Sequence, residues 1–202
     1  MNQEFDLTDT DGEIMVKLAR NAVKKYLETN IKVIDTEFNS KFTAKAGAFV
    51  TINKQNSLRG CIGYPLPIKK LSNAIIDAAI AAATEDPRFP PVNVDEIDQI
   101  IFEVTVLSPP AEINVKNYQD YLSMIKIGRD GLIVECNYKS GLLLPQVPIE
   151  YKWNVKEFLE HTCEKAGLDK HAWMDNDTKI SKFEGIIFKE ESPNGVIVRE
   201  IL

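Results

Sequence analysis

The stretch from Ser57 to Pro65, SLRGCIGYP, constrains the fold of this chain more than any other. A β-strand over these residues would alternate its side chains between two faces. The first face would carry Leu58, Gly60 and Ile62, and the second Arg59, Cys61 and Gly63. The two leucine-type residues favour the core, so the second face is expected to be the more polar one. The two glycines leave the backbone uncovered, so that a ligand or another strand can approach closely.

Cys61 is the candidate nucleophile of this stretch. A thiol beside the fixed positive charge of Arg59 has its reactive thiolate form favoured. The alternative is that Cys61 packs as a small buried hydrophobe, the usual fate of a free cysteine. That face would then have to accommodate a guanidinium as well. Both interpretations stay open from the residues themselves.

The neighbouring residues predict an antiparallel hairpin and a helix that packs on it. Residues 48–53 are rich in β-branched and aromatic side chains, and a polar turn at 54–56 separates them from the partner strand at 57–63. A helix is expected over 68–84. Its run of alanines would allow close packing of the helix against the sheet.

A stiff loop follows this helix. Residues 85–91 contain three prolines, which fix φ and remove backbone N–H donors. Asp86 and Arg88 flank Pro87 and are expected to form an ion pair. The loop is either a surface turn or a rigid presentation of charged side chains to a cleft.

The strand expected at residues 99–107 is apolar on both faces except for one carboxylate. Glu103 is ordinary if its face is half solvated. If both faces are covered, it is a buried carboxylate that needs a partner, for which Arg59 is the candidate. On this basis Glu103→Gln should destabilise the protein.

The second half of the chain begins after Ser108-Pro109-Pro110, the best internal boundary. A hairpin is expected over 125–136, and Trp173 is expected in the core. Gln146 is held between Pro145 and Pro148, either as a satisfied amide at a buried strand end or as a site residue. Two strands, at 183–189 and 196–201, predict a terminal hairpin. At the other end, Thr10 and Glu13 predict a capping box for a helix that reaches Thr29.

Composition narrows the class of partner. The 202 residues carry a net charge of −6, which disfavours nucleic acid as the main partner because duplex binding needs a basic stripe. Three cysteines without paired spacing argue for a reducing cytosol. The apolar stretch at 74–83 is too short to span a membrane, and the N-terminus does not resemble a signal peptide. His161 and Cys163 are two residues apart and diverge on a helix, so no metal site is expected.

Taken together, these motifs resemble the AMMECR domain family. The hexapeptide Leu58–Gly63 matches the family signature without a departure. The likeness continues through nearly the whole chain in one order. The further matching stretches are 47–51, 86–91, 103–109, 131–133, 143–147, Trp153, Phe158, Leu159, Cys163 and 165–168.

The resemblance implies a cytosolic α+β protein, built as two lobes with antiparallel sheets flanked by helices. It implies no established reaction and no known cofactor. Some genomes place such domains beside a Memo-like protein and a radical SAM enzyme, which suggests a shared pathway. We expect one domain over 1–202, with a larger lobe at roughly 1–110, a smaller one at roughly 111–180, and a C-terminal hairpin at 181–202 that closes a sheet.

Three hypotheses for function follow. The first is an enzyme, or an enzyme's partner subunit, that acts on a small anionic ligand in a cleft, with Cys61 and Glu103 as catalytic residues. The ligand-binding candidates are Arg59, Gly60, Gly63, Asp86, Arg88, Gln146 and Glu150. The second is a non-catalytic protein-interaction module. The third is weak binding of RNA or a nucleotide by Arg59, Arg88 and Phe89. The first hypothesis requires the side chains of Arg59, Cys61, Asp86, Arg88 and Gln146 to converge on one concave surface.

Overall fold

The computed structural model of the chain describes residues 7–33, 42 and 44–200. These divide into two compact units. The first comprises the described residues up to Leu107 together with those from Ile186 onward, and the second is Ser108–Gly185. Both units combine helices with antiparallel strands, which confirms the predicted α+β class with two lobes.

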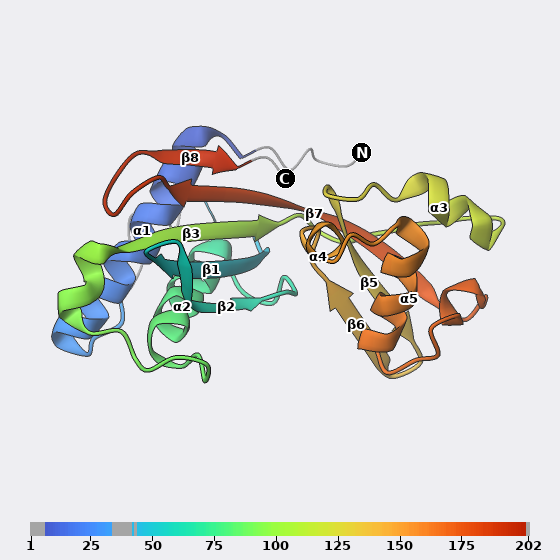
Figure 1. Cartoon of the computed structure of the whole chain (residues 1–202), viewed down its shortest axis with the longest axis horizontal. Helices are drawn as coiled ribbons and strands as arrows, with labels where there is room; N and C mark the ends of the chain where they lie inside the picture. Colours follow the sequence, from blue (N-terminus) through green and yellow to red (C-terminus); the bar gives the residue numbers. More distant parts are fainter. Residues whose placement is uncertain (1–6, 34–41, 43, 201–202) are drawn as a thin grey trace. The chain divides into compact units, whose positions relative to one another are not determined.

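The first unit is a sheet with two long helices packed on it (Figure 1). Its strands are β1 (Gly47–Lys54), β2 (Ser57–Tyr64), β3 (Ile100–Leu107), the second half of β7 (Lys179–Glu190) and β8 (Ile197–Glu200). Its helices are α1 (Asp9–Thr29), α2 (Leu71–Thr84) and the short 3₁₀ helix η1 (Val94–Gln99). The strand order is β2-β1-β3-β7, with β8 also paired to β7, so β2 is an edge strand.

The β1–β2 hairpin forms where the sequence predicts it. Gln55 and Asn56 both adopt positive φ, 50° and 62°, the backbone that a two-residue hairpin turn requires. The core face of the sheet is carried by alternate residues. Val50 and Ile52 of β1, like Phe102 of β3, are fully buried against the helices. The alternation therefore orients the sheet toward α1 and α2.

Helix α1 starts two residues before its predicted start. Thr8, not Thr10, is the N-cap, and Asp11 rather than Glu13 completes the capping box. The Thr8 side chain accepts a hydrogen bond from the Asp11 backbone N–H at 3.2 Å, and the Asp11 carboxylate accepts one from the Thr8 N–H at 2.9 Å. Aspartate at the third position can make the same reciprocal pair as glutamate, so two overlapping signals compete here.

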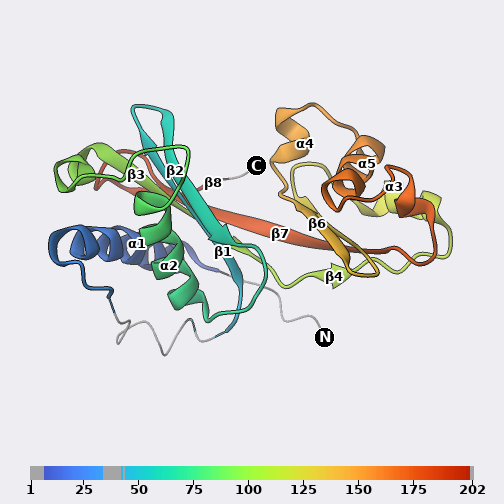
Figure 2. The ribbon, with the colours of Figure 1, turned by 90° about the horizontal axis from the view of Figure 1, so that it is seen from below.

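The second unit is a smaller sheet covered by α5. Its strands are β4 (Ala111–Glu112), β5 (Asp130–Cys136), β6 (Lys139–Leu143) and the first half of β7, and its helices are η2 (Tyr118–Asp120), α3 (Tyr121–Met124), α4 (Val147–Glu150), α5 (Val155–Lys165) and η3 (Ala172–Met174). Helix α5 lies against β5 and β6 (Figure 2). Trp173 is buried in this unit's core, as predicted.

Of the two further hairpins that the sequence predicts, one is absent and one is present. The hairpin expected over 125–136 is wrong: β5 turns at Asn137 and pairs with β6 instead. The segment before β5 is a turn, because the buried Asp130 carboxylate accepts the Lys126 backbone N–H at 2.9 Å. The C-terminal hairpin is present as β7 and β8, with Phe188 opposite Arg199.

Candidate functional site

A β-bulge interrupts the hairpin at the signature hexapeptide. Ile52 of β1 pairs with Gly60 of β2. The next residue of β1, Asn53, pairs with Leu58, so that Arg59 is an extra residue without a partner in the ladder. The regular alternation of side chains along β2 therefore breaks at Arg59.

The bulge changes which residues share a face. Thr51 and Asn53 lie on the same face of β1 because they are two positions apart, and they pair with Cys61 and Leu58. Cys61 and Leu58 thus share the face opposite the helices, and Leu58 is 40% exposed. The expectations that Leu58 faces the core and that Arg59 stands beside Cys61 are both wrong, since a single inserted residue inverts the alternation.

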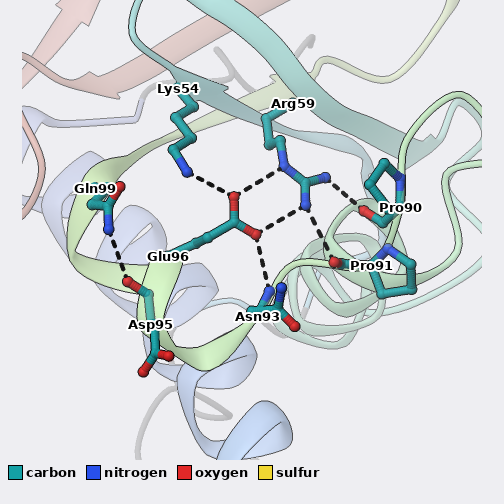
Figure 3. A network of polar contacts seen from close by, with 8 residues as sticks. All are labelled: Lys54, Arg59, Pro90, Pro91, Asn93, Asp95, Glu96 and Gln99. Atoms are coloured by element: carbon teal, nitrogen blue, oxygen red, sulfur yellow. Dashed lines mark hydrogen bonds and ion pairs between the residues drawn. The ribbon is translucent and has the colours of Figure 1, made fainter.

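Arg59 belongs to a network of internal contacts around Glu96 (Figure 3). Its guanidinium donates to the carbonyl oxygens of Pro90 and Pro91, at 2.7 and 3.2 Å, and to the Glu96 carboxylate at 3.1 Å. Lys54 donates to the same carboxylate at 2.8 Å. The hydrogen bond from Lys54, with those from Arg59, holds the pKa of Glu96 at about 2. Arg59 therefore ties the proline loop to the hairpin, and the geometry does not support its predicted role as an anion clamp.

Asp86 and Arg88 form the predicted ion pair, and together they hold the backbone of Cys61. The Asp86 carboxylate, in a residue only 4% exposed, accepts the Cys61 backbone N–H at 2.8 Å. Arg88 donates from Nε and Nη2 to the two Asp86 oxygens, at 2.9 and 2.7 Å. Its Nη2 also reaches the Cys61 carbonyl oxygen at 3.3 Å. The Arg88 hydrogen bonds hold the pKa of Asp86 well below its usual range.

This pair closes the open edge of the sheet at one point. An edge strand presents unpaired N–H and C=O groups that can recruit another strand. At Cys61 both groups are taken by the side chains of Asp86 and Arg88. The Arg88 side chain is nevertheless 53% exposed, and its Nη1 makes no hydrogen bond to any residue that the structure describes.

Cys61, Thr51 and Glu103 form a polar row across three strands. Thr51 of β1 is paired with Cys61 on one side and with Glu103 of β3 on the other. The Thr51 hydroxyl donates to Cys61 Sγ at 3.4 Å and also lies in hydrogen-bond contact with the Glu103 carboxylate. The row brings together the two residues that the sequence predicts as catalytic.

Burial governs the ionisation of both ends of the row. Burial raises the pKa of the Cys61 thiol, and the Thr51 hydrogen bond and the Arg88 charge oppose it only in part. The predicted preference for the thiolate is therefore wrong. Burial also raises the pKa of Glu103, with Glu200 adding to the effect and Lys189 opposing it. The cation near Glu103 is thus Lys189 rather than the predicted Arg59, which lies across the sheet with Glu96.

The two glycines of the hexapeptide are explained by close packing. A Cβ on Gly60 would lie 2.1 Å from the backbone oxygen of Ala82 in α2. A Cβ on Gly63 would lie 2.3 Å from the ring of Phe49. What approaches Gly60 is the helix, and what approaches Gly63 is the Phe49 ring together with the backbone oxygen of Ala48 at 2.6 Å. The predicted contact of the two glycines with a ligand stays a prediction.

The two candidates from the second half of the chain lie in the second unit. Gln146 immediately precedes α4, and its Oε1 is buried without a hydrogen-bond partner among the described residues. Glu150 ends the same helix and is exposed. The convergence of Gln146 and Glu150 with the residues of the first unit stays a prediction.

Over residues 7–33, 42 and 44–200, no three His, Cys, Asp or Glu side chains lie close enough together to hold a metal ion. None of the helices in those same ranges has both the length and the apolar character that a membrane span requires.

Sequence reasoning missed Glu96 and Thr51. Glu96 had a detectable signal, because Asn93 and Glu96 form a capping box at the start of η1, in the spacing typical of helix starts. Thr51 had none: its position between Cys61 and Glu103 follows from the register of three strands.

Comparison with known proteins gives a consistent result over the whole chain. A sequence model of the AMMECR1 family matches residues 16–188. A protein of Pyrococcus abyssi is 49% identical over 202 residues, covering 97% of this chain and 98% of its own length. A protein of Methanocaldococcus jannaschii is 46% identical over 198 residues, covering 97% and 98%. The crystal structure of uncharacterised protein PH0010 from Pyrococcus horikoshii superposes with a TM-score of 0.86 at 48% identity, over 98% of this chain and 100% of that one. The chain therefore belongs to the AMMECR1 family.

Proposed function

We propose that this protein binds a small anionic ligand at the Arg88 guanidinium next to Cys61, as an enzyme or as the partner subunit of one. The observation that carries the proposal is that the Arg88 guanidinium is fixed in position and still exposed. The buried Asp86 carboxylate holds one edge of the guanidinium through two hydrogen bonds, yet half of the Arg88 side chain is exposed and Nη1 has no partner among the described residues. A cation fixed in this way loses little conformational entropy when it binds an anion.

Asp86 makes this arrangement stable. A buried carboxylate with a strongly lowered pKa stays ionised at neutral pH, so it keeps Arg88 oriented without being neutralised itself. Because Nε and Nη2 already donate to Asp86 and to the Cys61 carbonyl, the donors left for a ligand are the two N–H groups of Nη1, and ionised acceptors such as carboxylates and phosphates make the stronger hydrogen bonds with them. The ligand class supported here is therefore a carboxylate or a phosphate.

The chemistry available beside Arg88 is that of a neutral thiol. With its pKa raised by burial, Cys61 is protonated at neutral pH. Any nucleophilic role requires the proton to leave, and the Thr51 hydroxyl and the Glu103 carboxylate form the adjacent path for it. Glu103, with a raised pKa, is closer to the poise of a general base than an ordinary surface glutamate.

A second candidate function is a non-catalytic protein-interaction module. The observation that favours it is the raised pKa of Cys61, since a protonated thiol is a poor nucleophile. In that case the anionic group would belong to a protein partner. Strand addition at β2 is disfavoured at Cys61 itself, where Asp86 and Arg88 already occupy the backbone.

The test is a thermal-shift screen against phosphate, sulfate, nucleotides and small carboxylates, because a ligand that binds the folded state raises its melting temperature. Arg88→Gln should weaken binding of the best anion about tenfold to a hundredfold, the loss expected for a charged hydrogen bond. Arg129→Gln is the matched control, since Arg129 is a half-exposed arginine that also pairs with a buried aspartate, Asp130. Equal effects of the two variants, or no stabilising anion, would overturn the proposal.

Cys61→Ser separates the two candidate functions. A serine replaces the thiol with a hydroxyl of similar size and position. Normal anion binding by this variant, together with no turnover of the bound compound by the unaltered protein, supports the interaction module. Loss of a measurable turnover with binding retained supports the enzyme.

The cellular setting is part of the proposal. The three cysteines are all free thiols in the structure, which supports a reducing compartment such as the cytoplasm. The pathway link to a Memo-like protein and a radical SAM enzyme, implied by the family resemblance, makes these proteins the first partners to test. Co-elution with either one in gel filtration should be lost on Arg88→Gln if their contact uses the anion site.

A further inference from the structure

The open edge of β2 carries an unpaired set of backbone groups beside the anion site. The N–H and C=O of Cys61 point away from β1, because they bind Asp86 and Arg88. Backbone groups repeat their direction every second residue, and the register with β1 is regular from Gly60 to Tyr64. The N–H and C=O of Gly63 therefore point outward as well. Gly63 is partly exposed, and neither group bonds to any residue that the structure describes.

The Asp86–Arg88 pair limits what can be added to this edge. It takes the place that a neighbouring strand would occupy beside Cys61, so a strand that pairs with Gly63 has to end before it passes Cys61. Because β2 runs from Cys61 toward Gly63, an antiparallel strand would end there with its C-terminus and a parallel strand with its N-terminus. The Arg88 cation attracts a terminal carboxylate and repels a terminal ammonium group. The charge therefore selects the antiparallel direction.

We propose that Gly63 and Arg88 together bind the last residues of an extended peptide that carries a free C-terminal carboxylate. The inference rests on the anion site at Arg88 proposed above and names the peptide carboxylate as its anion. The penultimate residue exchanges two backbone hydrogen bonds with Gly63, as in an antiparallel ladder. From there to Cys61 is two residues of strand, about 7 Å, which the last residue and its carboxylate cover. Strand addition and capture of a terminal carboxylate are both recurring modes of peptide recognition.

The surface beside Gly63 favours an apolar penultimate side chain. Residues paired across two strands share a face of the sheet, so this side chain lies over Gly63, on the face of Cys61. Phe49 of β1 is paired with Gly63 and partly exposed, and its ring comes within 2.3 Å of the position that a Cβ on Gly63 would take. The peptide side chain therefore packs against the Phe49 ring. Strand β2 ends at Tyr64, and Pro65 has no N–H, so recognition is confined to the last few residues of the peptide.

The test uses short fluorescent peptides with an apolar penultimate residue, titrated with the protein and followed by fluorescence polarisation. The peptide with a free carboxylate should bind about tenfold to a hundredfold more tightly than the same peptide with a C-terminal amide, the difference expected for a charged hydrogen bond. Arg88→Gln should abolish this difference. Arg129→Gln should keep it, since Arg129 pairs with a buried aspartate in the second unit.

N-methylated peptides test the strand pairing on the unaltered protein. A methyl group on the penultimate nitrogen removes the N–H that donates to the Gly63 carbonyl, and affinity should fall about tenfold. A methyl group on the residue before it should change affinity little, because that N–H points away from β2. The two peptides have the same composition and charge, so they differ only in the hydrogen bond to Gly63.

The proposal is overturned if the amide binds as well as the free carboxylate, or if the two N-methylated peptides bind alike. Acetate and inorganic phosphate distinguish its failure from that of the anion site. If either ion binds in a way that depends on Arg88, while no peptide with a free carboxylate binds more tightly than acetate, peptide recognition is wrong and the anion site stands. If Arg88→Gln changes the binding of neither the ions nor the peptides, both proposals are wrong.

Discussion

Cys61 and Glu103 have their ionisation set by burial on a face of the sheet that also carries Thr51. Neither group gains enough from neighbouring charges to offset the loss of solvation, so the pKa of both is raised. The consequence is a neutral thiol and a carboxylate that binds its proton more tightly than in the unfolded chain. The raised pKa of each group leads to a prediction that can be measured.

Glu103→Gln should stabilise the protein at neutral pH, the opposite of the effect expected from the sequence. The folded pKa of Glu103 lies above the ordinary value of 4.5, so the native state binds more protons than the unfolded state between these two pKa values. The stability of the protein therefore falls as the pH rises through the folded pKa. The glutamine variant has no charge at position 103 and therefore avoids this loss. Its urea midpoint should be higher than that of the unaltered protein at about pH 8, and the two midpoints should agree at about pH 4. Glu135→Gln, at an exposed strand position, should show no such pattern. A loss of stability at about pH 8 would mean that the Glu103 charge is favourably paired after all.

Cys61 should be alkylated more slowly than a free thiol at neutral pH. In a Cys136→Ser background, the remaining Cys163 is fully buried with a pKa of about 11, so iodoacetamide reports on Cys61. The rate should keep rising with pH beyond 9.0, the ordinary pKa of the group. Arg88→Gln should slow it further, since the Arg88 charge favours the thiolate. A rate that levels off below about pH 8 would restore the activated-cysteine hypothesis.

At the scale of elements, α2 and β2 approach each other through Gly60. The alanines of α2 and the missing side chain at Gly60 let the helix backbone come close to the edge strand. The same approach places the end of α2, with Asp86 just beyond it, within hydrogen-bond reach of the Cys61 backbone. The packing of this helix therefore builds the anion site proposed above.

Gly60→Ala should be more destabilising than Gly63→Ala. The new methyl at position 60 would meet the backbone oxygen of Ala82 at 2.1 Å, and a helix backbone cannot move aside without disturbing the core. The cost should be about 1–3 kcal/mol, as for other overpacked sites. At position 63 the nearest obstacle is the ring of Phe49, a side chain that can rotate, and the nearest backbone atom, the oxygen of Ala48, is farther away at 2.6 Å. Urea unfolding of both variants measures the difference, and equal costs would show that the helix can shift.

At the scale of the whole chain, a buried ion pair in the first unit joins helix α1 to the last residue of strand β7. Arg20 of α1 and Glu190 at the end of β7 are 7% and 2% exposed. Arg20 Nε donates to Glu190 at 2.7 Å, and its Nη1 donates to the Ile97 carbonyl at 2.7 Å. Glu190 also accepts the Phe102 backbone N–H at 2.9 Å. Strand β7 begins in the second unit and ends here, so the first unit is completed only when the last part of the chain is in place.

Removing one member of this pair should cost about 3–5 kcal/mol, because it leaves a buried charge without its partner. Arg20→Met and Glu190→Met are the single variants, and the double variant should be less destabilised than either. The exposed pair of Lys17 and Glu13 on α1 is the control, where Lys17→Met should cost less than about 1 kcal/mol. Single variants of the buried pair that lose no more than the control would show that water reaches the site.

The local features of this protein could be predicted from the sequence because they depend on neighbours along the chain. The β1–β2 hairpin follows from two runs of strand-forming residues around a polar turn, and the Asp86–Arg88 pair follows from their spacing about Pro87. The alternation of side chains along β3 and the family signature could be predicted for the same reason. Each needs information from a few adjacent positions only.

The candidate site depended on contacts between distant segments, which composition and spacing do not encode. The bulge at Arg59 moves Leu58 to the face of Cys61, and a one-residue slip in register cannot be seen in an alternating pattern. The charged partners of Arg59 and Glu103 lie on other elements of the chain. Arg20 and Glu190 likewise lie on two elements that are far apart in the sequence. The protonation state of Cys61 depends on the complete tertiary structure, because the thiol loses its solvation only once the sheet and its neighbours have packed around it.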